Sequence, residues 1–524
     1  MREECWVSQM PQEIELKLAI DVRDVPKLRR SSVLHELSLK HVTPRSLVSI
    51  YYDTPSFSLW RRGIVLRVRK IGRDRVQCVK MNAAATSVFQ RTELEGRIRG
   101  NKPDLMQIAD PNVRQLIQKH CADHGLARVF ATNVERETWL LRLGRSQIEC
   151  AIDRGVISSR TRKAPISELE LELKSGQPAR IYQLAHRLNA IVPLQIQTKS
   201  KEARGYDLIE RAKPAAPKAR PILVDPAMSV RECFAAIAQP CVTHVLAGAN
   251  FADKNDDPEG IHQLRVAIRR MRAAFSIFQG AMPENYRPRL AVELRTFEHR
   301  LGATRDWDVL VEETIASMPA SLRRQRSTQH LIRIAQAKRA EGDRSAHACL
   351  RDLQYTNILL QLASWVDSRF GSNASPAQAG KWQPDILARP ALEFAAETMR
   401  TYHDKARKLG RTVRKLNPAE LHRLRIRIKK LRYATELFGG FWPNRRTERY
   451  LAALKDLQQV LGAFHDTTVA EGLIAHFTAA ERAGAKLSTA PVSRWLTKHQ
   501  RRLRKEAIHL WREFARQKPF WKGG

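Results

Sequence analysis

The sequence has 524 residues, 43% of them hydrophobic, which is long enough for two or more domains that each have a core. Lys and Arg number 91 against 54 Asp and Glu, and the net charge of +37 indicates a polyanionic partner: a nucleic acid, a phosphate polymer or an acidic membrane surface. The seven cysteines include no CxxC pair, so we expect neither a zinc site nor a disulfide framework. No apolar run reaches the ~18 residues that span a bilayer, so we expect no membrane span. We predict a cytoplasmic protein.

Alternating apolar and charged residues predict short strands in the first 210 residues. They lie at residues 13–18, 65–70, 75–80, 90–96, 146–153 and 167–174. Helical patches at residues 103–121 and 179–188 separate some of them. Because successive side chains of a strand point to opposite faces, each strand has one apolar and one charged face. This pattern is typical of antiparallel strands with a few helices.

The segment SELELELKSG, residues 167–176, places Glu168, Glu170 and Glu172 on one face of a strand. A solvated face is the ordinary outcome of such alternation. The alternative is a strand that directs its carboxylates at a divalent cation. Other predicted strands carry charged faces at Glu13, Glu15 and Lys17, at Arg67 and Arg69, at Arg91, Glu93 and Glu95, and at Glu149 and Asp153. A closed barrel with a charged lumen accommodates all of these faces at once.

The chain changes character after a proline-rich segment. Residues 210–226 contain four prolines, which is typical of a linker. Helical periodicity then continues to the C-terminus, with a break at residues 370–390, which are rich in Gly, Ser, Ala and Pro. We therefore predict a first domain at 11–210, a linker at 211–227 and a helical domain at 228–524.

The helical half contains an internal repeat. Residues 257–272 correspond to residues 417–432, and residues 301–309 correspond to residues 461–469, both at an offset of 160. In each copy a histidine and three basic residues share one arc of a helix, beside an apolar stripe. These residues are His262, Arg265, Arg269 and Arg272 in the first copy and His422, Arg425, Lys429 and Arg432 in the second. Such a stripe repels itself without an anion, so we favour an anion-binding groove over two solvated faces.

The first half resembles the CYTH, or triphosphate tunnel metalloenzyme, family over about residues 11–210. The resemblance rests on EIELK, YYDTP, LRVRK, RTELE, ECAIDRG, ISELELELKSG and SKEARGY, which occur in the expected order. It implies an α+β domain built as an eight-stranded antiparallel β tunnel with flanking helices, which binds a triphosphate and one or two divalent metal ions. The pairing with a helical C-terminal half is similar to that of bacterial inorganic triphosphatases.

The CYTH resemblance also implies roles for individual residues. The metal ligands, for Mg²⁺ or Mn²⁺, would be Glu13, Glu15, Asp153, Glu168, Glu170 and Glu172. The substrate-binding residues would be Lys17, Arg67, Arg69, Lys80, Arg91, Arg136, Lys201 and Arg204. Catalysis would depend on Lys17, Arg67, Arg69, Lys80 and Glu170. Asn133 and Glu135 stand where relatives often carry further arginines, which predicts a weaker contact with one phosphate.

The repeat blocks resemble the CHAD domain, a histidine-containing α-helical domain, over about residues 228–524. The resemblance implies an all-α domain of two pseudo-symmetric four-helix bundles with a basic surface that binds inorganic polyphosphate. The corresponding positions are His262, Arg265, Arg269, Arg272, His422, Arg425, Lys429, Lys430 and Arg432. The copies differ at Asp308, which corresponds to Thr468, and the sequence leaves open whether Asp308 pairs with the basic stripe or caps a helix.

Together these features predict metal-dependent hydrolysis of inorganic triphosphate to diphosphate and phosphate, with polyphosphate binding by the helical half. Two alternatives remain open: a phosphohydrolase or cyclase acting on thiamine triphosphate or ATP, and a non-enzymatic polyphosphate-binding protein. We do not expect membrane contact. Specific nucleic-acid binding is not expected either, because the sequence has no recognisable nucleic-acid motif and only 7% aromatic residues.

Overall fold

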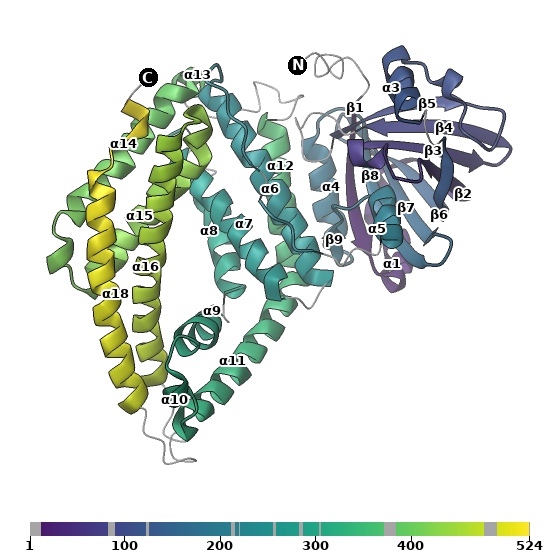
Figure 1. Ribbon diagram of the computed structural model, residues 1–524. Coiled ribbons are helices and arrows are strands. Elements are labelled where there is room, and N and C mark those ends of the chain that lie inside the picture. The colour runs from purple at the N-terminus through teal and green to yellow at the C-terminus, as the bar shows by residue number, and fades with distance from the viewer. Residues whose placement is uncertain are drawn as a thin grey trace. The chain divides into compact units, whose positions relative to one another are not determined.

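A computed structural model describes residues 12–81, 90–121, 125–210, 215–219, 221–254, 258–281, 287–302, 305–370, 384–475 and 490–522. These residues form two compact units (Figure 1). The first unit lies within Met1–Pro217, Val242–Asp256 and Arg351–Ala379, and the second within Lys218–Cys241, Asp257–Leu350 and Gly380–Gly524. Across the described ranges, no helix combines the length and the apolarity that a membrane span requires.

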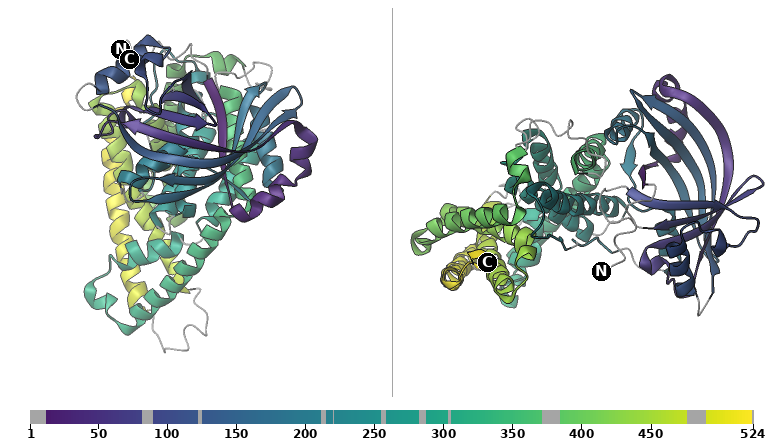
Figure 2. Two further views of the ribbon diagram at one scale, coloured as in Figure 1. Left: turned by 90° about the vertical axis from the view of Figure 1, so that its right-hand side faces the viewer. Right: turned by 90° about the horizontal axis from the view of Figure 1, so that it is seen from above.

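The first unit is built on one antiparallel sheet. Its strands are β1 (Gln12–Ile20), β2 (Ser38–Asp53), β3 (Ile64–Ile71), β4 (Asp74–Met81), β5 (Gln90–Arg97), β6 (Ala127–Leu143), β7 (Ser146–Ser158), β8 (Lys163–Ser175) and β9 (Leu194–Ile196). They are ordered β5-β4-β3-β2-β6-β7-β8-β1-β9, and β5 also pairs with β1. This last pairing closes β1 to β8 into a ring, whose curvature is visible in Figure 2.

The predicted antiparallel sheet domain with flanking helices is confirmed. The predicted count of eight strands omits β9, a three-residue strand that pairs with β1 alone. The helices that flank the sheet in the first 210 residues are α1 (Val25–Arg29), α2 (Ser32–Leu37), α3 (Pro111–Cys121), α4 (Ala179–Asn189) and α5 (Lys201–Glu210).

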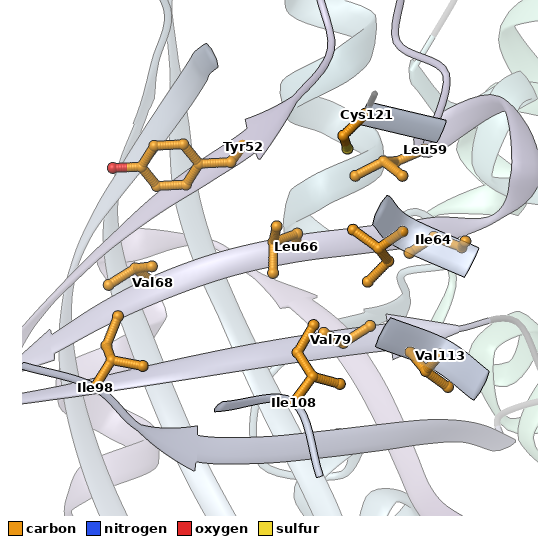
Figure 3. Close-up of a cluster of buried hydrophobic side chains, with 11 residues drawn as sticks. Tyr52, Leu59, Ile64, Leu66, Val68, Val79, Ile98, Ile108, Val113 and Cys121 are labelled. Atoms are coloured by element: carbon orange, nitrogen blue, oxygen red, sulfur yellow. The ribbon is translucent and has the colours of Figure 1, made fainter. Parts of the chain in front are cut away.

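An apolar cluster covers the outer faces of β3 and β4 (Figure 3). Leu66 and Val68 of β3 and Val79 of β4 pack there against Val113 and Ile117 of α3. All five side chains are at least 96% buried. Because side chains alternate along a strand, burying Leu66 and Val68 on this face directs Arg67 and Arg69 to the interior of the ring.

A later segment of the chain also packs on this unit. Helix α12 (Leu353–Phe370) lies against α4 and β9. The Oγ1 of Thr356 donates a hydrogen bond to the carbonyl oxygen of Leu194 at 2.7 Å, and Asn357 contacts Nδ1 of His186 at 2.8 Å. Although α12 follows the predicted linker, it belongs to the compact unit that contains the sheet.

The described residues of the second unit are helical, as predicted. Its longer helices are α7 (Pro258–Ile277), α8 (Arg287–Arg300), α11 (Arg326–Leu350), α14 (Ala391–Gly410), α15 (Pro418–Phe438), α16 (Arg445–Ala475) and α18 (Ala490–Arg516), with the first part of α6 (Val230–Lys254). The repeated helices α7 and α15 pack against each other, and α14, α15, α16 and α18 pack in succession. The grouping into two four-helix bundles stays a prediction.

Local sequence explains where α15 begins. Asn417 caps the helix by accepting a hydrogen bond from the backbone N–H of Glu420, and the Glu420 carboxylate accepts one from the backbone N–H of Asn417. Pro418 follows at the first helical position, where its missing N–H costs nothing. This capping box fixes the start of the second basic stripe.

Candidate active site

The strands of the ring and α5 line a charged cavity of about 490 Å³. Sixteen of the described residues line it, and Tyr51 and Leu173 are the uncharged ones among them. The cations are Lys17, Arg67, Arg69, Lys80, Arg136, Lys174 and Lys201. The anions are Glu15, Glu93, Glu95, Glu149, Glu170, Glu172 and Glu202. Seven positive charges therefore face seven negative charges in a confined space.

Strand register aligns three carboxylates on one wall of the cavity. Glu15 of β1 lies opposite Glu172 of β8, and Glu149 of β7 lies opposite Glu172 on its other side. Burial, helped by Glu149 and Glu15, raises the pKa of Glu172 in spite of its ion pair with Lys174 at 2.7 Å. These like charges on three adjacent strands repel one another, and in this structure Lys17 pairs with Glu15 while Lys174 pairs with Glu172.

A second acidic group lies at the base of the cavity and already contains basic partners. Oxygens of Asp153, Glu168 and Glu170 lie within 4.8 Å of one another. Arg136 donates two hydrogen bonds to Asp153, at 2.7 and 2.6 Å, and also pairs with Glu170. Lys201 Nζ lies 2.6 Å from Asp153 and 2.7 Å from Glu170, and it also pairs with Glu168.

Nearby cations keep the carboxylates at the bottom of the cavity ionised. Burial alone would raise the pKa of Asp153, but Lys201 and Arg136 lower it. Burial likewise opposes the ionisation of Glu170, yet Lys201, Lys17 and Arg136 hold its pKa well below the ordinary range. Asp153 and Glu168 are fully buried and do not contribute to the cavity lining. In this structure they anchor Arg136, Lys201 and Arg204.

The opposite wall is organised around Glu93 of β5. Its carboxylate lies 2.8 Å from Arg67 and 2.6 Å from Lys80. The thiol of Cys78 donates to the same carboxylate at 2.7 Å, and burial raises the pKa of that thiol to about 12. A thiol that stays protonated is a poor nucleophile, which agrees with the interpretation of Cys78 as a packing residue.

Arg69 of β3 differs from the other arginines of the cavity. Its Nε donates a hydrogen bond to Oγ of Ser49 at 3.2 Å, and within the described ranges it forms no ion pair. Arg67, burial and Arg136 together lower the pKa of Arg69. The cavity thus contains a guanidinium that is crowded by other cations and forms no ion pair with a carboxylate of the described residues.

Helix α5 places Lys201 against the strands because a glycine lets it approach closely. A Cβ atom on Gly205 would lie 2.2 Å from the ring of Phe130 on β6. Phe130 in turn stacks on Tyr51, with ring centroids 4.3 Å apart. The glycine of SKEARGY therefore sets the position of the lysine that joins the three carboxylates at the base.

In the second unit, the basic helix of each repeat copy lies against the second repeated block of the same copy. The guanidinium of Arg265 lies 3.0 Å from the position of a Cβ on Gly302, and that of Arg425 lies 3.8 Å from the same position on Gly462. These residues correspond at the offset of 160. Asp308 pairs with Arg339 of α11 at 2.7 Å, a residue outside the basic stripe.

Four of the nine predicted polyphosphate residues line a cavity of about 340 Å³ between α7, α14 and α15: Arg269, Arg272, Lys429 and Lys430. The remaining five, His262, Arg265, His422, Arg425 and Arg432, are not among its lining residues. His422 instead contacts His465, with Nδ1 atoms 3.1 Å apart, and Arg432 pairs with Glu436 at 2.6 Å. The basic stripe is therefore divided between a cavity and contacts within the bundle.

Comparison with known protein families agrees with this geometry. Residues 11–206 match the model of the CYTH domain, and residues 236–475 match the model of the CHAD domain. The chain is a CYTH–CHAD protein. The charged ring of strands lies in the CYTH match, and the repeated helices α7 and α15 lie in the CHAD match.

Individual relatives cover part of this arrangement. An inorganic triphosphatase from Haemophilus influenzae is 31% identical over 205 residues, which are 38% of this chain and 55% of that protein. An uncharacterized protein from Mycobacterium tuberculosis is 26% identical over 237 residues, 44% of this chain and 43% of that protein. The chain thus spans about half the length of these curated relatives. A crystal structure of the CHAD domain from the plant Ricinus communis is 25% identical and covers 58% of this chain and 98% of its own, with a TM-score of 0.47.

The CYTH tunnel collects most of the residues that the sequence predicted for it. Lys17, Arg67, Arg69, Lys80, Arg136, Lys201, Glu15, Glu170 and Glu172 line the cavity. Arg204 pairs with the buried Glu168. Glu13 and Arg91 lie opposite each other on β1 and β5, and their side chains fall outside the described residues. Asn133 and Glu135 are exposed and do not line the cavity, so they give no reason to expect a weakened phosphate contact.

The sequence predicted no individual role for several lining residues. Glu93, Glu95 and Glu149 belong to the charged strand faces that were predicted to face the lumen, and Lys174 continues the alternation of Glu168, Glu170 and Glu172. Glu202 follows Lys201 at the start of α5, where strand alternation gives no indication of its direction.

Proposed function

We propose that the CYTH tunnel hydrolyses inorganic triphosphate to diphosphate and phosphate with a divalent cation, Mg²⁺ or Mn²⁺. The observation that carries this proposal is Arg69, a largely enclosed guanidinium beside Arg67 and Arg136 with no ion pair among the described residues. A cation in such a setting is costly unless an anion joins it. Phosphate oxygens accept strong, often bidentate hydrogen bonds from a guanidinium.

The lining supports an inorganic substrate over thiamine triphosphate or ATP. Among the described residues of the lining, Tyr51 is the one aromatic residue, and its ring is 99% buried and stacked on Phe130. Leu173 is the one aliphatic residue of that described lining. A thiazolium or adenine ring would therefore meet charged side chains instead of a flat apolar surface, whereas a triphosphate would meet cations.

The divalent cation fits the row of Glu15, Glu172 and Glu149. Carboxylate oxygens are the ligands that Mg²⁺ and Mn²⁺ take from proteins, and this row has unfavourable like-charge contacts that a cation relieves. When bound, the cation supplies charge neutralisation at phosphate oxygens and acidifies water. Asp153 and Glu168, also predicted as ligands, remain candidates whose oxygens basic side chains contact in this structure.

The chain's own residues supply binding and orientation. Lys17, Arg67, Arg69, Lys80, Arg136 and Lys201 direct their cationic groups at one cavity and would hold the triphosphate for in-line attack by water. Glu170 is a positioning residue in this proposal, because a carboxylate whose pKa is held so low is a weak proton acceptor. It fixes Lys17, Arg136 and Lys201 instead.

The decisive experiment measures phosphate release from inorganic triphosphate, ATP, thiamine triphosphate and long-chain polyphosphate, each with Mg²⁺, Mn²⁺ or EDTA. We expect release from inorganic triphosphate with either metal and none in EDTA. Hydrolysis that persists in EDTA contradicts the metal requirement. A preference for ATP or thiamine triphosphate favours a phosphohydrolase or cyclase that acts on an organic triphosphate. No hydrolysis of any substrate favours a non-enzymatic polyphosphate-binding protein.

We also propose that the CHAD domain binds inorganic polyphosphate through the surface around Arg269, Arg272, Lys429 and Lys430. Burial, followed by repulsion from Arg269, lowers the pKa of Lys429 to about 8. We expect binding to the full chain that weakens steeply with salt, by analogy with counterion release from nucleic acids. The double variant Arg269→Ala with Lys429→Ala should lose it, whereas Arg494→Ala with Lys498→Ala, on the exposed face of α18, should keep it.

A further inference from the structure

The cavity between α7, α14 and α15 combines cations with apolar surface. Besides Arg269, Arg272, Lys429 and Lys430, its lining includes Tyr402, Ile426, Tyr433, Ala273, Ser276 and Ile277. A neighbouring cavity of about 250 Å³ shares Tyr402, Ile426 and Lys430 with it and adds Lys405, Arg423 and Arg427. We call these two cavities together the α14–α15 pocket.

Exposed apolar surface in this pocket is not required by the helix packing. Ile426 is 41% exposed, in contrast to Leu424 and Ile428, which are fully buried in the core. Tyr402 is half-buried, and its hydroxyl donates to the carbonyl oxygen of Ser276 at 3.5 Å. The pocket therefore offers Ile426 and Tyr402 as apolar contacts beside its cationic side chains, and such a mixed lining is typical of small-molecule sites.

Some residues of the pocket also differ between the two copies of the internal repeat. At the offset of 160, Ile426 corresponds to Val266 and Tyr433 corresponds to Ala273. The larger residues therefore occur in the second copy, while the basic positions Arg269 and Lys429 occur in both. An unsubstituted phosphate chain would use the repeated basic stripe equally in both copies and has no need of this difference.

Tyr433 connects the apolar and the basic parts of the pocket. The guanidinium of Arg432 lies 4.5 Å from its ring centroid and the ammonium group of Lys429 lies 5.9 Å from it. Lys429 is thereby held at the boundary between Arg269 and the tyrosines, where phosphate oxygens and an attached ring system would both find partners.

We propose that the α14–α15 pocket binds a nucleoside polyphosphate, with its phosphates on Arg269, Lys429 and Lys430 and its base on Ile426 and Tyr402. The main cavity of about 340 Å³ lies within the range of small-molecule sites. Nucleobases stack between aromatic and apolar side chains, whereas the described lining of the CYTH tunnel is charged apart from Tyr51 and Leu173. The site shares cations with the proposed polyphosphate surface, so the two ligands compete.

Calorimetric titration of the full chain with ATP tests this assignment. EDTA is present throughout and the chain carries Arg69→Ala, which together weaken binding in the tunnel. Inorganic triphosphate is the reference ligand, since it has the same phosphates without a nucleoside. We expect ATP to bind at least about tenfold more tightly than triphosphate, and long-chain polyphosphate to displace it.

Two matched variants separate the nucleoside contact from general anion binding. Ile426→Ser, at an exposed position, should weaken ATP binding about fivefold to tenfold and leave polyphosphate affinity within twofold. Val292→Ser, at a 58% exposed position of α8, should change neither. Lys429→Gln should weaken both ligands.

The outcomes distinguish this inference from the proposed function. Equal affinity for ATP and triphosphate, or equal losses of ATP and polyphosphate binding in Ile426→Ser, would overturn the nucleotide assignment while leaving polyphosphate binding intact. Tight ATP binding without any polyphosphate binding would support the nucleotide site and contradict the polyphosphate proposal. Saturation-transfer NMR adds an independent readout. The protein transfers magnetisation to the base protons of ATP only if the base contacts the protein.

Discussion

Glu15 of β1 lies directly opposite Glu172 of β8, and Glu149 of β7 extends the same row. Two carboxylates of this row are paired with lysines: Lys17 contacts Glu15, and also Glu170, and Lys174 contacts Glu172. A divalent cation on the row would replace Lys17 and Lys174 as the partners of these carboxylates and leave both lysines for phosphate. We therefore expect metal and triphosphate to bind cooperatively.

Glu172→Gln should weaken Mn²⁺ binding by about tenfold or more, because it removes the central carboxylate of the row. Electron paramagnetic resonance of free Mn²⁺ measures this without any turnover. Glu135→Gln, on the exposed face of β6, is the control and should bind Mn²⁺ normally. Unchanged Mn²⁺ affinity in Glu172→Gln would move the metal site to another carboxylate group.

The pH dependence of Mn²⁺ binding should reflect the raised pKa of Glu172. A carboxyl with a raised pKa takes up its proton at a higher pH than an ordinary glutamate, and the protonated form is no ligand. Affinity should thus fall as the pH drops towards that raised pKa, before ordinary glutamates titrate. Titrations between pH 4.5 and 8 measure the midpoint, and Glu172→Gln should shift the remaining dependence to lower pH.

Arg69→Ala and Arg136→Ala should have different effects on folding. Removing Arg69 should cost roughly 2–4 kcal/mol of transition-state stabilisation, measured through kcat/KM, and leave stability unchanged or higher, since Arg69 is repelled by Arg67 and Arg136. Removing Arg136 leaves Asp153 and Glu170 with one fewer partner in a buried site and should cost about 3–5 kcal/mol of folding stability. Denaturant unfolding compares the two, and equal stability of both variants would contradict the ion-pair assignment.

Polyphosphate binding should weaken as the pH rises through about 8, where Lys429 loses its charge. The sign follows from the lowered pKa: the ammonium form that attracts phosphate is present below that pH. Bound phosphate raises the pKa again, so binding near pH 8 should take up protons, which calorimetry in buffers of different ionisation enthalpy detects. Lys429→Arg should bind without this pH dependence, and a wild-type affinity that is flat from pH 7 to 9 would contradict the assignment.

Gly205→Ala should lower both stability and activity. The added Cβ would lie 2.2 Å from the ring of Phe130, so α5 must move away from β6 and carry Lys201 with it. Overpacking of this kind costs roughly 1–3 kcal/mol. Gly72→Ala is a useful comparison, because a Cβ there has no neighbour within 4 Å although its φ of +60° adds backbone strain. Activity that survives in Gly205→Ala would show that the position of Lys201 is not critical.

The sequence by itself determined which face of each strand is charged. Leu66 and Val68 had to pack outward once Arg67 and Arg69 alternated with them, because the side-chain period of a strand is two. The repeat at an offset of 160 likewise determined that two basic helices exist, and the motif order identified both domain families.

Only the tertiary structure decided which charges meet. Alternation assigns a face but no register, since the backbone hydrogen bonds of a ladder are the same in any register, so the row of Glu15, Glu172 and Glu149 followed from strand pairing. The contact of Lys201 with Asp153 joins a helix to a strand 48 positions earlier in the chain, and it depends on the close approach that Gly205 permits. Electrostatic partners are set by distance in space, and the linear pattern does not contain that distance.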